Sequence, residues 1–562
     1  MLVSYANSRW EEKQDRLWRH CMASARGARV VLLVVTLLLV AGVLCQGIHF
    51  GEFHLNTDEA LHAVTGLYFA DLLADRHYSH PVQYTYEYYA RYPALGLIHW
   101  PPLFHFTEGI AFSVFGPSVV TARLTVLLFA LLGSYFWFRL VTLLHGEWSG
   151  AASTVLLAFL PLLLLYEKAV MLDIPSLALC IAASYFWIRY LEKGEGRLLY
   201  WFAVFASLAL LTKQHAIYLV VFCLLSVLAT DKWRFLVNWT TAKALGFCFL
   251  LAGPFYILAF AHHARTIAED VFVGTAGSDH PYLYYFAKLP NSMGWPLLIL
   301  SLLGIATSPW WEKRESLKIM LSWIAACYIT ITPLGQKEPR YAIYWLPALV
   351  YFAVGPWVSL LRRPRLRLVG ATVLLLLLAN QTVLAWSYRR PYLSGYKAVA
   401  NWVVRNDCSG VILFDGDLFA DFIFYLRVYD PAKQFVVLRK ALYAKRIYKE
   451  YGSAELLHNE QDLQQLVDDY GIKCVIVETG MPLKFSVQGT LRHMVQGPEF
   501  KLAETFPLDT NDPEFEGRRV LVYENKAPKP LTATVVHLRM LTLSRDIVVP
   551  VESLLGARTR SR

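Results

Sequence analysis

The amino-acid sequence predicts a polytopic α-helical membrane protein with a C-terminal soluble α/β domain. Hydrophobic residues make up 56% of the 562 residues and charged residues only 17%, with a mean hydropathy of +0.38. Soluble domains carry about 25% charged residues. Long apolar runs follow one another up to about residue 390, and a run of roughly 20 residues crosses a bilayer. Beyond that point, short β-branched runs alternate with helical patterns, which is typical of an α/β domain.

We expect eleven spans, within a range of about eleven to thirteen. The N-terminal tail, residues 1–29, is too long for the charged region of a cleaved signal peptide, so the first apolar run is expected to remain as a span. Pro102–Phe115 is apolar but short and begins with proline, which favours a re-entrant or surface helix. The expected spans are residues 30–49, 121–143, 151–167, 173–191, 198–212, 215–229, 242–261, 293–309, 317–333, 341–358 and 367–387.

Lysine and arginine predict the orientation. Basic residues cluster in the N-terminal tail and in alternate later loops, for example at 232–243, 313–318 and 362–367, and eleven spans place all of these on one side. Since basic loops stay in the cytoplasm, we expect a bacterial inner (plasma) membrane protein with a cytoplasmic N-terminus and an external C-terminal domain. The net charge of +10 is explained by this topology and does not indicate a nucleic-acid partner.

The domain boundaries follow from the same change in composition. A transmembrane domain is expected over residues 30–390, with a first external loop at about 50–120. An external α/β domain with a largely parallel sheet is expected over 391–526, with strands at 411–415, 435–438 and 474–478 and a helix at 461–470. The tail at 527–562 has strand-like pieces of uncertain placement. The sequence leaves open whether Cys408 and Cys474 form a disulfide.

An acidic pair, Asp58 and Glu59, opens a helical pattern in the first external loop. His62 lies one turn after Asp58 and therefore shares its face. An apolar stripe from Leu61 to Leu72 predicts that the helix lies along the membrane surface. Acidic residues also favour the first turn of any helix, so a role limited to the helix terminus is the alternative.

Other charged and aromatic residues are expected at the same membrane face. Arg123 opens the second span and suits either a phosphate or an interfacial anchor. Asp173 and Lys213 lie in outward turns close to the bilayer, where charge is costly and marks a site or a structural ion pair. The segment GQKEPRY at 335–341 suits a lipid phosphate, or ordinary headgroup anchoring. It contributes the candidates Lys337, Arg340 and Tyr341, and His99 and His215 complete the set.

The ordered motifs DEALHAVTG, HWPPLFHF, MLDIP, LLTKQH and KEPRY, spread over roughly residues 30–390, resemble those of a known superfamily. They are similar to polytopic glycosyltransferases with a GT-C fold, related to dolichyl-phosphate-mannose protein mannosyltransferases and to bacterial aminoarabinose transferase-like enzymes. The resemblance places Asp58, Arg123, Asp173, Lys213 and Arg340 at family positions. In one departure, Trp100 precedes the proline pair where the family often has a lysine, and His99 is a candidate substitute.

The resemblance implies transfer of a sugar from a polyprenyl-phosphate donor to a lipid, glycan or protein acceptor on the outer face, with inversion. Asp58 or Glu59 is the expected general base. Lys213, Arg340, Lys337 and Arg123 are the expected phosphate ligands. The expected substrate contacts are His62, His99, Asp173, His215 and Tyr341. No cofactor is required, although a divalent metal between Asp58 and the phosphate stays open. A transporter or lipid flippase, or a scaffold acting through the C-terminal domain, is the alternative.

Overall fold

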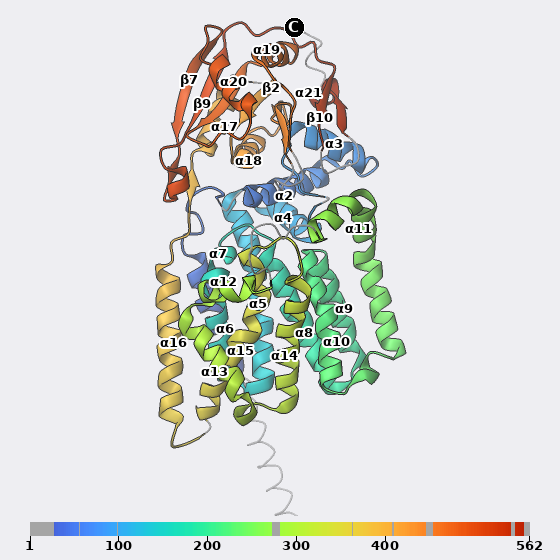
Figure 1. The fold of residues 1–562 in the computed structure, drawn as a ribbon, viewed down its shortest axis with the longest axis vertical. Coiled ribbons are helices and arrows are strands. Elements are labelled where there is room, and N and C mark those ends of the chain that lie inside the picture. The colour runs from blue at the N-terminus through green and yellow to red at the C-terminus, as the bar shows by residue number, and fades with distance from the viewer. Residues whose placement is uncertain are drawn as a thin grey trace, which may run out of the picture.

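Figure 1 shows a computed structural model, in which a bundle of long helices carries a layer of shorter helices and then a strand-containing domain. The structure describes residues 27–54, 57–97, 99–272, 282–361, 363–406, 408, 410–445, 453–540 and 546–555. The predicted fold class is confirmed. Its two predicted parts lie at opposite ends of the long axis, with the first external loop between them.

Each of the eleven predicted spans falls on a helix or on a bent helix pair. By length and composition alone, five helices among the described residues can cross a membrane, and two bent pairs raise this to seven. The pairs are α6–α7, bent by 72°, and α12–α13, bent by 117°. The helices are Gly27–Cys45, α5 (Val119–His145), α6 (Glu147–Ala158), α7 (Pro161–Glu167), α8 (Asp173–Lys193), α9 (Gly196–Leu210), α10 (Tyr218–Ala229), α11 (Trp239–Phe272), α12 (Tyr284–Met293), α13 (Trp295–Trp311), α14 (Arg314–Ile331), α15 (Leu346–Leu361) and α16 (Arg367–Ser387), with 3-10 turns η1 (Gln214–Ile217), η2 (Trp233–Phe235) and η3 (Pro339–Tyr344).

The first external loop forms α2 (Asp58–Asp75), α3 (Pro81–Arg91) and α4 (Leu103–Phe115). The short helix α4 corresponds to the segment predicted to be re-entrant or superficial. Helix α2 packs on α4 on one side and on α18 (Phe419–Tyr429) on the other, and residues all around it are buried. Its position along the membrane surface remains a prediction. An apolar stripe does not reveal that a distant domain covers the opposite face.

The C-terminal domain contains a five-stranded sheet in the order β3-β2-β6-β9-β7. Strands β3 (Phe435–Leu438), β2 (Gly410–Asp415) and β6 (Cys474–Thr479) are parallel, as predicted, whereas β9 (Arg519–Asn525) pairs antiparallel with β6 on one side and with β7 (Phe500–Pro507) on the other. The sheet is therefore mixed rather than largely parallel. Ile412 pairs with Cys474 in the register of β2 and β6, and Cys408 forms a disulfide with Cys474.

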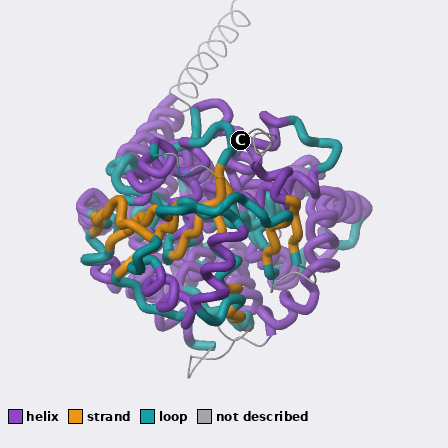
Figure 2. Tube along the Cα trace, turned by 90° about the horizontal axis from the view of Figure 1, so that it is seen from above, coloured by secondary structure: helices purple, strands orange, loops and turns teal. Residues whose placement is uncertain are grey.

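Helices and small hairpins complete this domain. Seen from above, its strands extend across the helical layers (Figure 2). The strand-like pieces of the tail form an antiparallel hairpin followed by a short helix. The remaining elements are α17 (Tyr396–Arg405), α19 (Glu460–Asp469), α20 (Ser486–Met494), α21 (Val551–Leu555), the pairs β1–β8 (Leu393–Ser394, Asp509–Thr510), β4–β5 (Tyr443–Lys445, Ser453–Glu455) and β10–β11 (Val535–Leu538, Ile547–Pro550), and η5 (Pro513–Phe515).

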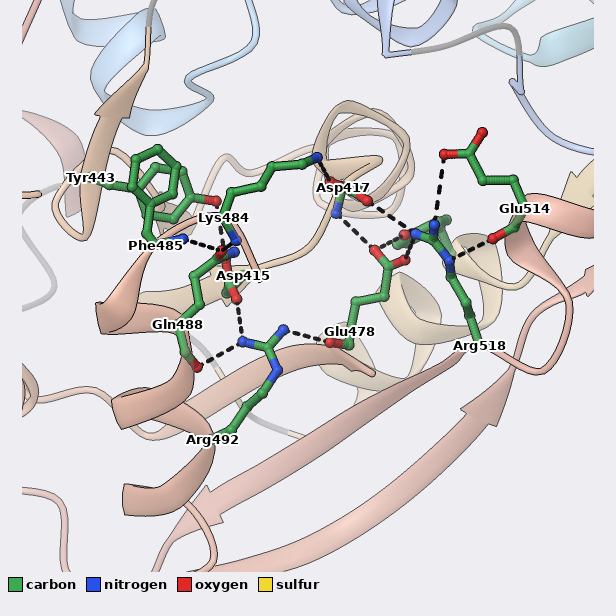
Figure 3. Close-up of polar contacts among 11 residues, drawn as sticks. Asp415, Asp417, Tyr443, Glu478, Lys484, Phe485, Gln488, Arg492, Glu514 and Arg518 are labelled. Atoms are coloured by element: carbon green, nitrogen blue, oxygen red, sulfur yellow. Dashed lines mark hydrogen bonds and ion pairs between the residues drawn. The ribbon is translucent and has the colours of Figure 1, made fainter. Parts of the chain in front are cut away.

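A network of charged side chains joins the carboxyl ends of β2 and β6 (Figure 3). Asp415 accepts a hydrogen bond from Arg492 at 2.8 Å, and Glu478 accepts one from Arg518 at 2.9 Å. Asp415 and Glu478 are fully buried, so each requires its arginine partner. Asp417, which follows β2, also binds Arg518 at 3.0 Å. These ion pairs hold the carboxyl ends of β2 and β6 in place.

Candidate active site

Asp58 is the accessible member of the acidic pair. It is the first residue of α2, where unpaired backbone N–H groups favour a carboxylate. Its side chain is 29% exposed, and its Oδ2 lies 3.3 Å from Nη1 of Arg340. Thr57 precedes it but makes no side-chain capping bond. Asp58 therefore presents a carboxylate beside a cation at the mouth of the membrane domain.

Glu59 differs from its neighbour because its side chain is fully buried. One carboxylate oxygen accepts the backbone N–H of His54 at 3.0 Å, and the other accepts that of Val170 at 3.1 Å. Nη2 of Arg390 lies 3.2 Å from one oxygen and 3.3 Å from the other. Glu59 therefore fastens the start of α2 to the helix bundle and to the segment leading into the C-terminal domain.

Arg123 lies inside the protein and is 1% exposed. Its Nη1 donates to the carbonyl oxygens of Ile48 at 2.8 Å and Phe50 at 2.9 Å, and its Nη2 donates to that of Glu52 at 2.8 Å. Its Nε is 3.9 Å from Glu59. These contacts shape the loop before α2 and occupy both terminal nitrogens of the guanidinium, which was predicted to bind the donor phosphate.

A second charged group lies in the turn after α9. Lys213 donates to Asp173 at 2.6 Å, and the Lys213 ammonium lies 5.0 Å from the centre of the Tyr341 ring. His215 and Arg340 also lie beside Tyr341: the ring centre of His215 is 4.0 Å from that of Tyr341, and the Arg340 guanidinium is 5.6 Å from the same ring. Tyr341 thus connects the Lys213 group to the Asp58–Arg340 pair.

Several polar atoms of this group are buried and lack a hydrogen-bond partner in the part of the chain that the structure describes. They are Nε of Arg340, both ring nitrogens of His215 and Oδ2 of Asp173. Buried polar groups normally have partners. Unpaired atoms on three neighbouring residues are typical of a site that a polar ligand completes.

His62 faces inwards, one turn after Asp58, and its Nδ1 lies 2.9 Å from Nε2 of His105. Burial, the nearby His105 and the positive charges of Arg340 and Lys213 lower the pKa of His62 well below its usual range. The ring of Trp100 packs 4.3 Å from that of His62. His62 therefore contacts both His105 and the indole of Trp100, one turn after Asp58.

The two remaining candidates lie at the periphery. His99 is exposed, and its carbonyl oxygen accepts a hydrogen bond from Gln214 at 2.8 Å. Lys337 contacts the carbonyl oxygen of Thr332 and lies 5.7 Å from the ring centre of Tyr285. Of the predicted residues, the structure thus brings Asp58, Arg340 and the Lys213 group together, and it directs Lys337 elsewhere.

Sequence reasoning missed Arg390 and the contacts between the C-terminal domain and α2. Arg427 of α18 binds both oxygens of Asp71, at 2.8 Å through Nε and at 2.5 Å through Nη2. Lys433 binds Asp75 at the end of the same helix. These ion pairs could not be predicted from the sequence, because the basic residues lie more than 300 positions after the acidic residues of α2.

Within the described ranges, no group of three or more His, Cys, Asp or Glu side chains is placed to hold a metal ion. The expectation that the chemistry needs no cofactor, and the open question of a divalent ion at Asp58, remain predictions.

Comparison with known proteins gives two sequence matches. Residues 99–258 match the family described as dolichyl-phosphate-mannose-protein mannosyltransferase. An uncharacterized protein of Aquifex aeolicus (strain VF5) is 26% identical over 265 residues, which cover 44% of this chain and 51% of that protein. The chain thus spans about half the length of this curated relative.

Solved structures match over most of the chain. ArnT from Cupriavidus metallidurans, bound to undecaprenyl phosphate, aligns with a TM-score of 0.59 at 14% identity, covering 88% of this chain and 98% of ArnT. The archaeal oligosaccharyltransferase AglB from Archaeoglobus fulgidus, in complex with an inhibitory peptide and a dolichol-phosphate, gives 0.51 at 13% identity, covering 80% and 69%. The mycobacterial arabinofuranosyltransferase AftD gives 0.52 at 16% identity, covering 89% and 40%. The chain therefore has the GT-C fold of the superfamily that includes protein mannosyltransferases and ArnT-like glycosyltransferases, as its sequence motifs predict.

Proposed function

We propose that this protein is a membrane glycosyltransferase that moves a sugar from a polyprenyl-phosphate donor to a lipid, glycan or protein acceptor on the outer face of a bacterial inner membrane. The GT-C fold supports the general activity, and the structural relatives ArnT and AglB carry polyprenyl-type lipid phosphates. One observation carries the proposal. Asp58 lies 3.3 Å from Arg340, 282 positions away, beside the Lys213–Asp173 pair and several unpaired polar atoms.

In the proposed reaction, the acceptor hydroxyl oxygen attacks the anomeric carbon of the donor. The bond between that carbon and the phosphate oxygen breaks, and the lipid phosphate leaves with the electron pair. Asp58 takes the hydroxyl proton. In this single displacement the acceptor oxygen attacks opposite the departing phosphate, and the configuration therefore inverts. Because negative charge grows on the leaving phosphate, nearby cations lower the barrier.

Arg340 and Lys213 are assigned to that leaving phosphate. Arg340 has a buried Nε without a partner in the described chain, which an anionic oxygen would satisfy. Lys213 is held by Asp173 and by the face of Tyr341, so its ammonium is positioned before the donor binds. The ring of His215, with its unpaired nitrogens, packs 4.0 Å from that of Tyr341 and adds further polar atoms to this group.

Glu59 and Arg123 are assigned to positioning rather than to chemistry. Glu59 is fully buried and already accepts backbone N–H groups and an arginine, which leaves an acceptor hydroxyl no access. Arg123 donates to backbone carbonyls of the loop that leads to Asp58. The sequence left open whether Asp58 or Glu59 is the general base, and we assign this role to Asp58.

The proposed orientation rests on two observations. The Cys408–Cys474 disulfide belongs to the C-terminal domain, and disulfides persist in oxidising compartments outside the cytoplasm. The ion pair Arg29–Glu147 joins the first span to the start of α6, and Lys232–Glu315 joins the basic loop after α10 to the start of α14. Basic loops gathered on one side favour a cytoplasmic location for that side.

The test is turnover by the purified full chain in proteoliposomes that contain a polyprenyl-phosphate with a radiolabelled sugar. We expect the label to move from the lipid to an acceptor or to water, and the anomeric configuration of the product to be opposite to that of the donor. A product with retained configuration, or no turnover across mannosyl, glucosyl, arabinosyl and aminoarabinosyl donors, would argue against the proposed reaction.

A further inference from the structure

We infer that Trp100 is the platform on which the ring of the transferred sugar packs. The inference rests on the proposed function and adds a sugar subsite to it. It concerns the position at which the sequence departs from the resembling family, where an indole replaces a lysine. An indole carries no charge and cannot take over a phosphate, but its face suits the C–H side of a sugar ring.

The backbone around Trp100 is anchored on both sides. On the α2 side, the N–H of Gly96 donates to Oγ1 of Thr65 at 3.1 Å, and the N–H of Trp100 donates to the carbonyl oxygen of Gly96 at 3.0 Å. On the α9 side, Gln214 donates to the carbonyl oxygen of His99 at 2.8 Å. Hydrogen bonds therefore connect this loop both to the helix that begins with Asp58 and to the turn that contains Lys213.

The indole itself is held in a fixed orientation. A Cβ atom on Gly96 would lie 2.1 Å from Cε3 of Trp100, so only glycine leaves room for the ring. The ring of His62 packs 4.3 Å from the indole at an angle of 54°, and His62 in turn is hydrogen-bonded to the buried His105. Trp100 nevertheless remains partly exposed, whereas His62 and His105 are buried.

This placement divides the site by chemistry. Gln214, the residue after Lys213, donates to the residue before Trp100, and His62, which packs on the indole, lies one turn after Asp58, the partner of Arg340. His62 is neutral, and the surface beside Trp100 is therefore aromatic and uncharged. A donor whose phosphate contacts Arg340 and Lys213 places its sugar ring, the next group, over this surface. The substrate class is a sugar ring that presents an apolar C–H face.

The experiment compares binding of two probes by the full chain in nanodiscs. The probes are a short-chain polyprenyl-phosphate and the same lipid bearing the sugar that the wild type turns over. Trp100→Ala is expected to lose about tenfold in affinity for the sugar-bearing lipid while its affinity for the sugar-free lipid changes by less than about twofold. Trp100→Phe keeps an aromatic face and is expected to retain most of the affinity.

Two further variants keep the test decisive. Trp100→Leu keeps apolar bulk without an aromatic face and is expected to behave like Trp100→Ala, which covers the case in which the alanine variant does not fold. Trp233→Ala removes a 56% exposed tryptophan in η2, among the loops at the other end of the bundle, and is expected to bind both lipids normally.

The outcomes separate this inference from the proposed function. An equal loss for both lipids in Trp100→Ala and Trp100→Leu, or no loss for either, overturns the sugar platform. A wild type that binds the two lipids equally overturns it as well. A wild type that binds neither lipid overturns the proposed function itself.

Discussion

Replacing Arg390 by methionine removes a cation that holds the buried carboxylate of Glu59 at the start of α2. Nη2 of Arg390 lies 3.2 Å from Glu59, and the two side chains are 8% and 0% exposed. Breaking a buried ion pair by removing one partner costs about 3–5 kcal/mol. Two backbone N–H groups and Arg123, 3.9 Å away, still face Glu59 in the variant. We therefore expect Arg390→Met to lower the free energy of unfolding by about 3 kcal/mol, the lower limit of that range.

The substitution should also lower the rate of sugar transfer, because Asp58 is the residue before Glu59 and depends on the same turn of α2. If the pair fixes the first turn of α2, Arg390→Met lowers turnover by at least about tenfold, which corresponds to about 1.4 kcal/mol in the barrier. Glu59→Gln alone should be milder, since the amide oxygen still accepts one of the backbone N–H groups. The double variant should recover part of the loss, because it leaves no uncompensated charge.

The assay pairs sugar turnover in proteoliposomes with thermal unfolding of the same preparations. Arg389→Met is the matched control, since Arg389 is the exposed neighbour of Arg390 and should change neither quantity. The assignment of Glu59 to positioning would be refuted if Glu59→Gln abolished turnover while its melting temperature equalled that of the wild type. That result would make Glu59 the base.

The structure makes three more predictions. Lys213→Gln should lower kcat/KM by about 100-fold, because a positioned cation at the leaving phosphate is lost, whereas Lys337→Gln should change it less than about threefold in the same assay. Replacing Cys408 and Cys474 by serine should destabilise the C-terminal domain by about 2–4 kcal/mol in urea titrations, since the bridge joins residues 66 positions apart. Burial raises the pKa of Glu52 to about 7 although three backbone N–H groups favour its charged form. The free energy of unfolding should therefore fall by about 3 kcal/mol as the pH rises from about 4.5 to 7. Glu52→Gln should flatten this dependence in thermal melts from pH 4.5 to pH 8. Equal losses in both lysine variants, an unchanged urea midpoint or a wild-type melt that rises with pH would contradict the respective predictions.

The helical architecture was largely predictable because its signal is local. An apolar run of sufficient length predicts a span wherever it occurs. The α6–α7 break falls inside the predicted span 151–167, and the α12–α13 break lies at the start of the predicted span 293–309. The strands β2, β3 and β6 were predictable for the same reason. Their β-branched runs are local, whereas the antiparallel pairing of β9 with β6 and with β7 depends on long-range contacts.

The candidate site was predictable only in part. Asp58, Lys213 and Arg340 stood out because charge beside a bilayer is costly wherever the sequence places it. The difference between Asp58 and Glu59 was not readable, since it depends on Arg390, 331 positions later. Trp100 appeared in the sequence only as a departure from a motif, and its position beside His62 required the packing of α2 against α4.

The most direct test of the central claim is sugar turnover by Asp58→Asn, measured beside the wild type in proteoliposomes with the active donor lipid. The asparagine side chain keeps the shape of the residue and cannot accept the proton. The account predicts that Asp58→Asn folds, binds the polyprenyl-phosphate and loses turnover by about 100-fold or more, in line with the contribution of a general base. Wild-type turnover in a folded Asp58→Asn variant would contradict it.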